Sequence, residues 1–463
     1  MHYYAYEMAH AVLSPWRFGM QALRHSLDSP FNPMSRTTMG RNMAAACEVF
    51  ENLTRRYGKP EFLIKNTQIN GLAVPIRQET ALAKPFCNLL HFARDEAVAG
   101  TRHDPKVLIV APMSGHYATL LRGTVESMLP EHDVYVTDWT DAREIPIAMG
   151  RFDFDDFIDY LIEFVQFIGP NTHVIAVCQP AVPALVATAL MAQRGDAIQP
   201  ASLVLMGGPI DTRRNPTKVN ELAAARSLEW FERNVTTTVP FPHPGCMRPV
   251  YPGFMQLTGF MQMNLERHMT AHSELFNNLV KGDCDSVKQH QDFYEEYMSV
   301  MDLTAEFYLQ TVKTVFQDHA LPDKKLVHRN VLVDCGAIKQ TALMTVEGER
   351  DDICGLGQTE AAHDLCTAIP QDEKVHYVQP GVGHYGVFNG TRFRTEIQPR
   401  IREFIRTVQY KRKANGPETR MPKPFRSVKD QTATDDVHDW KAPKANGRLN
   451  GANGKHLPAV AGE

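Results

Sequence analysis

The chain has 463 residues, of which 43% are hydrophobic and 22% are charged, so it can bury a large core and lacks the composition of a disordered protein. Its formal net charge of −4 is small, which gives no electrostatic reason to expect a nucleic acid or an anionic membrane as the main partner. No apolar run approaches the roughly 20 residues that a transmembrane helix needs.

The first residues and the cysteines indicate a reducing compartment. The opening MHYYAYEMAHAVLSPWRFGM lacks a basic region, and Glu7 and His10 interrupt its apolar stretch, so it does not have the form of a secretory signal. The eight cysteines fall into no C-x-x-C or Cys/His ligand spacing. We therefore expect a cytoplasmic protein without disulfides, metal site or cofactor.

Apolar periodicity divides the chain into segments in order. Residues 1–60 have helical spacing. In residues 61–210, FLIKNT and GLAVPIR flank a turn at Asn70 and Gly71 and predict a leading antiparallel pair. Strands and helices then alternate, which predicts a parallel sheet covered on both faces. The expected strands are 106–112, 133–139, 173–177 and 202–208, and the expected helices are 119–129, 154–168 and 183–193.

The alternation stops in residues 211–330, where helical spacing recurs in 219–235, 254–281 and 286–318. A helical insertion between strands of one parallel sheet predicts a cap over the carboxyl edge of that sheet.

The core resumes in residues 331–410. Strands are expected at 341–346 and 374–379, and a last helix at 393–409. Residues 411–463 contain few apolar residues and predict a disordered tail.

Cys178 lies between the strand at 173–177 and the helix that follows, in the sequence AVCQPA. On α/β-hydrolases this strand-to-helix turn carries the nucleophile, usually in the pattern G-x-S-x-G. Ala176 is small, as the tight turn requires, whereas Pro180 departs from the pattern but is compatible with a first helical turn. Although most free cysteines are buried small hydrophobes, this position predicts an α/β-hydrolase fold with Cys178 as the nucleophile.

The acid of such a site follows a late strand, in the chain order nucleophile, acid, histidine. VEGERDDI follows the strand at 341–346 and offers Asp351 and Asp352. We favour Asp351, because it stands three residues after Gly348, as in the G-x-x-D turn common in related hydrolases. The alternative is that both are solvated turn residues.

The histidine is expected in QPGVGHYGVF, after the strand at 374–379. Among 19 histidines His384 has the right position, and the glycines around it allow the loop to fold back toward the elbow. His376, inside the strand, is expected to be a packing residue.

An oxyanion hole needs two backbone N–H groups, one after the nucleophile and one from the loop after the first central strand. Gln179 supplies the first. The loop APMSGHYAT supplies the second, at Met113 or Ser114, and it lacks the HGGG run that would fix the choice.

The sequence resembles the intracellular polyhydroxybutyrate depolymerases over nearly the whole chain. The resemblance rests on MHYYAYEMAHAVLSPWRFG, APMSGHYATLLRGTV, VTDWTDAREIP, VCQPAVPALV, VEGERDDI and GVGHYGVFNG. It implies a cytoplasmic enzyme at the surface of storage granules, which hydrolyses amorphous polyester to 3-hydroxybutyrate oligomers and monomer. It also implies cysteine in the place of serine, at Cys178, with Asp351 and His384 completing the triad.

The expected chemistry is acyl transfer through a thioester on Cys178, which water then cleaves. Coenzyme A could replace water, because thioester exchange is nearly isoenergetic. Polyhydroxybutyrate is therefore the expected partner and coenzyme A a second acyl acceptor, whereas the oligomeric state does not follow from the sequence.

Other functions fit parts of the same pattern. A polyester synthase also uses a cysteine on a related fold, but its typical G-x-C-x-G-G does not match Ala176 and Pro180. A general carboxylesterase or thioesterase would have a similar elbow. A non-catalytic granule-coat protein could retain the fold, since function resides in the site.

Overall fold

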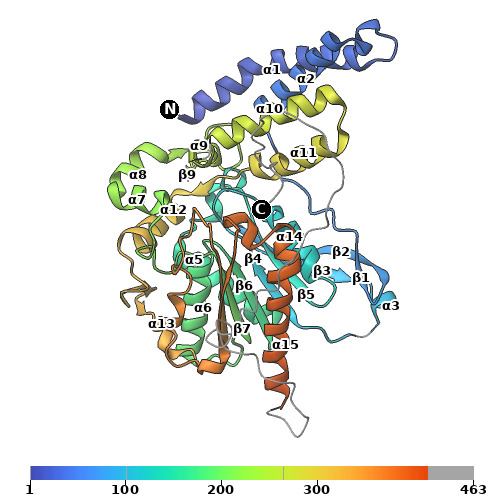
Figure 1. Ribbon diagram of the computed structural model, residues 1–463. Coiled ribbons are helices and arrows are strands. Elements are labelled where there is room, and N and C mark those ends of the chain that lie inside the picture. The colour runs from blue at the N-terminus through green and yellow to red at the C-terminus, as the bar shows by residue number, and fades with distance from the viewer. Residues whose placement is uncertain (1, 101, 264, 415–463) are drawn as a thin grey trace, which may run out of the picture.

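A nine-stranded sheet lies at the centre of the computed structural model, which describes residues 2–100, 102–263 and 265–414 (Figure 1). The strand order is β1-β2-β3-β5-β4-β6-β7-β13-β14. Pairing is antiparallel from β1 to β5 and parallel from β5 to β14. The strands are β1 (Asn66–Ile69), β2 (Leu72–Ala83), β3 (Cys87–Arg94), β4 (Lys106–Val110), β5 (Asp133–Trp139), β6 (Thr172–Val177), β7 (Ser202–Met206), β13 (Ala342–Gly348) and β14 (Lys374–Gln379).

Helices cover both faces of this sheet, so the central strands are mostly buried. Every residue of β6 and β7 is buried, as their unbroken apolar sequences require. α5 (Phe154–Ile168) packs with α6 (Ala181–Arg194) on one face, and α4 (Arg122–Met128) packs with α15 (Gln398–Ala414) on the other (Figure 1). The expected α/β-hydrolase fold, with a mostly parallel central sheet, is confirmed.

Between β7 and β13 the chain forms a group of helices with a small sheet of its own. Its helices are α7 (Lys218–Ala225), α8 (Leu228–Val235), α9 (Gly253–Met263), α10 (Leu265–Lys281), α11 (Cys284–Met298) and α12 (Ala305–Thr311). Its short strands are β8 (Thr237–Thr238), β9 (Pro249–Tyr251) and β10 (Leu303–Thr304), and β11 (Val327–His328) pairs with β12 (Val331–Leu332). The helical stretch expected over 286–318 is interrupted, because Leu303 and Thr304 pair with β9 instead.

A helical hairpin precedes the core and rests on the inserted helices at the top of Figure 1. It consists of α1 (His2–Asp28), a 3-10 turn (Pro33–Arg36) and α2 (Thr38–Thr54). α2 packs against α10, and Tyr3 of α1 is buried with Ala142, Val239 and Val250.

Three further α-helices are short: α3 (Glu96–Ala99), α13 (Ala362–Leu365) and α14 (Gly390–Arg392). No helix in the described ranges is long and apolar enough to cross a membrane.

The last helix extends past residue 410, where the disordered tail was expected to begin, and ends at Ala414. Two basic side chains hold this final turn: Lys411 pairs with Asp372, and Arg412 donates to the carbonyl of Gln340. The remainder of the expected tail, 415–463, lies outside the described residues.

Candidate active site

Cys178 has a backbone conformation that side chains other than glycine rarely adopt. Its φ is 63°, between the last residue of β6 and the start of α6. Its N–H donates to the carbonyl of Met206 at 2.7 Å, and its own carbonyl accepts from the N–H of Ala181 at 3.0 Å. Pro180 fits this turn, since its φ of −59° is helical. This strained turn has the form of a nucleophile elbow.

Two glycines after β7 allow the segments of Cys178, Asp351 and His384 to approach one another. A Cβ on Gly208 would lie 2.1 Å from the Cβ of Ala181 and 3.0 Å from the carbonyl oxygen of Cys178. Gly207 has a φ of +55°, and a Cβ there would lie 3.3 Å from His384 Cε1 and 3.4 Å from Asp351 Oδ2. Sequence reasoning assigned no role to this pair, although two glycines at the end of a strand are a signal of close backbone approach.

The loops after β13 and β14 bring a carboxylate and an imidazole together. His384 Nδ1 lies 2.7 Å from Asp351 Oδ2. The other carboxylate oxygen of Asp351 accepts from the N–H groups of Ile353 at 2.9 Å and Cys354 at 2.8 Å. The Asp351 side chain is fully buried, so its orientation is fixed from both sides.

The neighbouring residues that competed for these roles are placed elsewhere. Asp352 is exposed, and the described part of the chain shows it no hydrogen-bond partner. His376 lies in β14, where its Nδ1 is 2.8 Å from the Thr345 hydroxyl. The structure thus pairs His384 with Asp351.

The charge state of His384 depends on what surrounds it. Burial lowers the pKa of this imidazole, but the Asp351 carboxylate and the Cys178 thiolate raise it, and the net pKa lies well above its usual value. The Cys178 thiol is within hydrogen-bonding reach of the imidazole. The His384 imidazole thus lies between the Asp351 carboxylate and the Cys178 sulfur, the arrangement in which a histidine can activate a cysteine.

Glu347 is a further organising residue that the sequence pattern did not reveal. Its buried carboxylate accepts from the N–H groups of Gly357 at 2.8 Å, Thr359 at 2.7 Å and Glu360 at 3.1 Å. The Thr359 hydroxyl in turn accepts from the N–H of Gly208 at 2.8 Å. These bonds tie the loop that carries the acid to the end of β7.

The expected oxyanion donors lie in two segments, one directly after Cys178 and one after β4. Gln179 follows Cys178, and Met113 and Ser114 follow β4. Within the described residues, no protein acceptor bonds the backbone N–H of any of the three. Met113 is buried and Ser114 half-buried, and the geometry does not select between them. Free donors on both sides of the elbow are what an oxyanion hole requires.

The side chain of Gln179 is also placed unusually. It is 9% exposed, and both polar atoms of its amide are buried without a hydrogen-bond partner among the described groups. A buried amide without partners costs free energy, so this one is suited to a substrate group at the elbow.

The inserted segment packs against the loop after β4, which contains Met113 and Ser114. A Cβ on Gly115, which has a φ of +102°, would lie 2.6 Å from Oε1 of Gln256 in α9. The Gly115 carbonyl accepts from the N–H of Met301 at 2.6 Å. His116 Nε2 lies 3.0 Å from the Tyr297 carbonyl, and burial lowers the pKa of His116 to about 4, so its ring is neutral at pH 7.

Aromatic side chains cover the same region. Tyr385 follows His384, and its ring centroid is 6.2 Å from that of Tyr297 in α11. Burial, Tyr297 and the Cys178 thiolate all raise the pKa of Tyr385, which keeps its phenol neutral beside the nucleophile. No group of three or more His, Cys, Asp or Glu side chains in the described ranges is arranged to hold a metal ion.

Three esterases are among the solved structures that match this chain in a structural comparison. An esterase from Thermogutta terrifontis is 16% identical, with a TM-score of 0.37, over 74% of this chain and 97% of its own. A carboxylesterase from Nitrososphaera gargenis is 10% identical, with a TM-score of 0.39, over 75% and 99%. A carboxylesterase from Bacillus subtilis is 11% identical, with a TM-score of 0.36, over 79% and 98%.

Comparison by sequence gives one family. No curated protein matches the chain. Residues 207–409 match the family model described as PHB de-polymerase C-terminus, where PHB is polyhydroxybutyrate. The matched segment contains Gly207, Asp351 and His384, and Cys178 precedes it. Over residues 207–409 the chain is therefore similar to the PHB de-polymerase C-terminus family, which confirms the resemblance to polyhydroxybutyrate depolymerases in that segment.

Proposed function

We propose that this chain is a carboxylic ester hydrolase that depolymerises polyhydroxybutyrate, with Cys178 as its nucleophile. The observation that carries the proposal is Cys178 at a positive-φ elbow beside His384, which bonds Asp351 at 2.7 Å. The family match of residues 207–409 supports the polyester substrate. As the substrate is a storage polymer, we place the enzyme in the cytoplasm at the granule surface.

The first half of the reaction forms a thioester. The Cys178 thiolate attacks an ester carbonyl, and N–H groups of Gln179 and of Met113 or Ser114 stabilise the oxyanion. The His384 imidazolium then gives its proton to the departing hydroxyl end of the polymer. Asp351 holds the imidazole in the tautomer and orientation that this transfer needs.

The second half releases the acyl group. Neutral His384 takes a proton from water, the hydroxide attacks the thioester, and the thiolate leaves with 3-hydroxybutyrate oligomer or monomer as product. Coenzyme A is an alternative acceptor, because its thiol would exchange with the enzyme thioester at little cost in free energy.

The test is product analysis on amorphous polyhydroxybutyrate particles, with and without coenzyme A. We expect the wild-type enzyme to release 3-hydroxybutyrate oligomers and monomer without coenzyme A, and Cys178→Ala to release none. Cys178→Ser should keep reduced activity that resists iodoacetamide, because serine depends more completely on the base. Cys284→Ser changes an exposed cysteine and serves as the matched control, with full activity expected.

Full activity of Cys178→Ala would refute the nucleophile. Release from small esters alone would indicate a general carboxylesterase or thioesterase. Polymer growth from hydroxyacyl-coenzyme A would indicate a synthase-like acyltransferase, and no turnover of any ester would indicate a coat protein.

A further inference from the structure

α1 exposes a row of large apolar side chains to solvent, in addition to the apolar residues, such as Leu27, that it buries on its inner side. Surface helices normally present charged and polar residues on the solvent face. Glu7 pairs with Arg56, two residues after α2 ends, and the Arg17 guanidinium donates to the carbonyl of Thr54, the last residue of α2. His10, one helical turn from Glu7, bonds Arg17 at 3.2 Å. Most polar interactions of this helix are therefore made within the hairpin, and the Tyr3 hydroxyl and Glu7 also reach Asp302 and His243 of the inserted segment.

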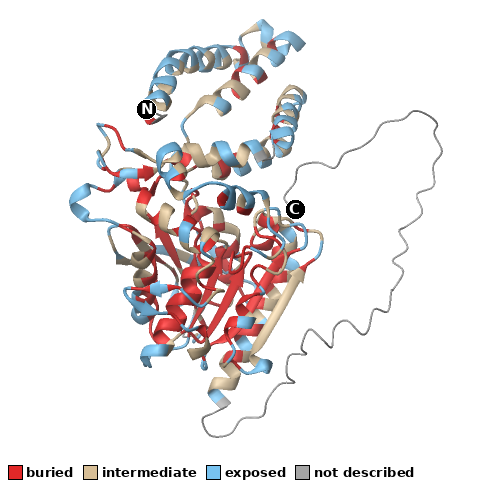
Figure 2. Cartoon of the chain, turned by 90° about the vertical axis from the view of Figure 1, so that its left-hand side faces the viewer, coloured by how far each residue is buried: buried red, intermediate tan, exposed pale blue. Residues whose placement is uncertain are grey.

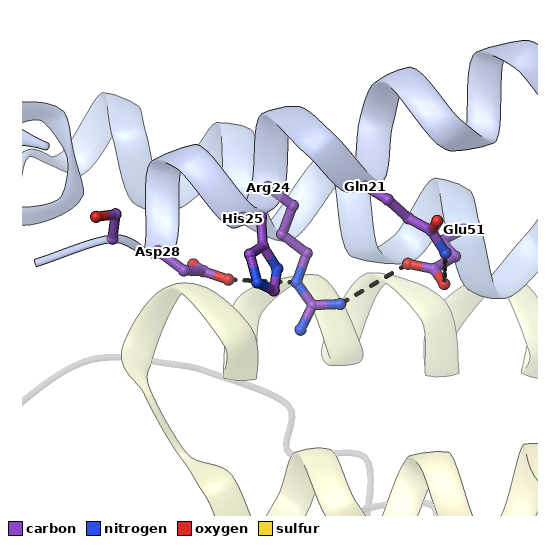
Figure 3. Close-up of a pocket in the computed structure, with 6 residues that line it drawn as sticks. Gln21, Arg24, His25, Asp28 and Glu51 are labelled. Carbon is purple, nitrogen blue, oxygen red and sulfur yellow. Dashed lines mark hydrogen bonds and ion pairs between the residues drawn. The ribbon is translucent and has the colours of Figure 1, made fainter.

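The same is true at the far end of the hairpin, where a polar pocket of about 710 Å³ lies between the helices (Figure 3). Arg24 lies 3.1 Å from Glu48, 3.4 Å from Asp28 and 3.9 Å from Glu51. Gln21 donates to Glu51 at 2.5 Å. The lining residues are Gln21, Arg24, His25, Asp28, Ser29 and Glu51. Because Gln21, Arg24 and their acidic partners bond one another, these groups are part of the hairpin's internal bonding.

The outward face of α1 is apolar over its length. Tyr4, Met8, Val12 and Trp16 recur every four residues and are 61–66% exposed. Leu23 follows on the same face and is 38% exposed. Ala5, Pro15 and Gly19 occupy the positions between them, so no charged residue interrupts this face. Figure 2 shows the exposed side of the hairpin turned away from the buried core. We call these eight residues the outer face of α1.

The dimensions of the outer face argue against a second protein molecule as its cover. A helix of 27 residues is about 40 Å long and about 10 Å wide, so one face offers about 400 Å². A stable protein interface needs about 800 Å² from each partner. A single convex helix face is thus about half of what a dimer would require.

The chemistry of the outer face also argues against an anionic membrane. Interfacial helices that bind anionic lipid carry Lys and Arg beside their apolar face. Arg17 and Arg24 of α1 are directed instead into the hairpin, where they bond Thr54 and Glu48. An uncharged, apolar and extended surface fits such a face best, and amorphous polyester has these properties.

We propose that the outer face of α1 docks the enzyme on the surface of its insoluble polyester substrate. This inference rests on the proposed function. It also has a structural connection to the site, because α1 contacts the helices above Cys178. The Tyr6 ring stacks on Phe254 of α9 at 4.2 Å, and α9 carries Gln256, which contacts Gly115 of the oxyanion loop. A docked α1 would hold α9 and the catalytic loops beside the polymer.

The test compares the full-length enzyme with the triple variant Met8→Gln, Val12→Gln, Trp16→Gln. All three residues are more than 60% exposed and glutamine is a good helix former, so the fold should be retained. Sedimentation with amorphous polyhydroxybutyrate particles measures adsorption, and p-nitrophenyl butyrate measures soluble-ester hydrolysis. We expect adsorption and particle hydrolysis to fall about tenfold or more, with the soluble-ester rate changed less than about twofold.

The matched control is Phe167→Gln, Leu222→Gln, Val331→Gln, which removes apolar side chains that are 46–51% exposed on other surfaces. This variant should adsorb like the wild type. Equal loss of adsorption in the control, or wild-type adsorption by the α1 variant, would overturn the docking surface.

Two alternative occupants give distinct results. If light scattering shows a dimer for the wild type and a monomer for the α1 variant, the outer face of α1 binds a second copy of the chain. Binding to phosphatidylglycerol vesicles in place of the particles would assign it to a membrane. A wild-type enzyme that adsorbs through α1 without releasing products would refute the proposed function and leave the docking surface standing.

Discussion

Cys178 depends on its neighbours in two separate ways. Its backbone is held at positive φ by β6, α6 and the bond to Met206, a constraint that is independent of the side chain. Its thiol depends on His384. Burial lowers the pKa of this imidazole, and the Asp351 carboxylate raises it. Substitution of the acid should therefore change the chemistry of Cys178 without changing the elbow.

Asp351→Asn should lower activity by about 10² or more, whereas Asp352→Asn should change it little. The corresponding change in serine triads costs about 10⁴ in rate, and a cysteine enzyme depends less on its acid. Without the carboxylate, burial lowers the pKa of His384, so less imidazolium stabilises the thiolate at pH 7. Alkylation of Cys178 by iodoacetamide should slow accordingly.

The measurement is the pH profile of alkylation beside kcat for both variants. A structural role for Asp351 alone would leave the alkylation profile unchanged. Equal losses at the two positions, or a larger loss at Asp352, would contradict the assignment of the acid.

At the scale of elements, Asp302, which lies between α11 and β10, connects α1, α9 and the loop after β5. Its carboxylate accepts from the Tyr3 hydroxyl of α1 at 2.8 Å and from the N–H of Gly253 in α9 at 3.0 Å. Its N–H donates to Asp141 after β5 at 3.1 Å. Burial and the Asp141 carboxylate raise the pKa of Asp302 to about 7, against a lowering effect of Arg143.

This raised pKa predicts how stability depends on pH. Between its ordinary value near 3.8 and about 7, the folded state binds a proton at Asp302 that the unfolded state does not. The stabilisation is complete below the ordinary value and is lost as the pH rises toward 7. Asp302→Asn removes the titration, so the melting temperature of the wild type relative to this variant should fall across that window.

Asp292→Asn, at an exposed carboxylate in α11, is the control and should show no such trend. A difference between wild type and Asp302→Asn that stays constant from pH 4 to 7 would contradict the raised pKa.

The elements best predicted from sequence are those with local signals. The ranges expected for β5, α5 and β14 coincide with the observed ones. α5 begins after a capping box at Asp153 and is followed by the C-cap residue Gly169, so its limits are encoded in adjacent residues. β3 was not anticipated, because Cys87–Arg94 becomes a strand through pairing with β2 and β5. Such pairing is not visible in a local pattern.

The candidate site shows the same division. Cys178, Asp351 and His384 follow strands at positions that the fold makes recognisable, and the structure brings them together. Gly207 lies against His384 and Asp351, and Glu347 accepts from the N–H of Thr359. These contacts join segments far apart in the sequence, so only the folded chain shows them. The contacts of α9 and α11 with the oxyanion loop are long-range for the same reason.

At the scale of the whole molecule, the eight cysteines differ in how far they are buried. The sequence distinguished only Cys178 from the other seven. Five are buried in the core or between helices: Cys47, Cys87, Cys335, Cys354 and Cys366. Burial raises the pKa of the Cys87 and Cys354 thiols well above the usual value, which makes them unreactive. Cys178 and Cys246 are half-buried, and Cys284 is exposed at the start of α11.

Iodoacetamide should therefore label more than one cysteine, whereas the loss of activity should follow the labelling of Cys178 alone. Cys284 is accessible but has no catalytic partner among the described residues, so its alkylation should leave activity unchanged. In a Cys284→Ser, Cys246→Ser background, loss of polymer hydrolysis should match labelling of Cys178 in step, as measured by peptide mapping. Adding Cys178→Ser should abolish that labelling and leave a slow enzyme that iodoacetamide does not inhibit. Inactivation that continues in this triple variant, or labelling of Cys178 without loss of activity, would mean that the thiol at the elbow does not carry the reaction.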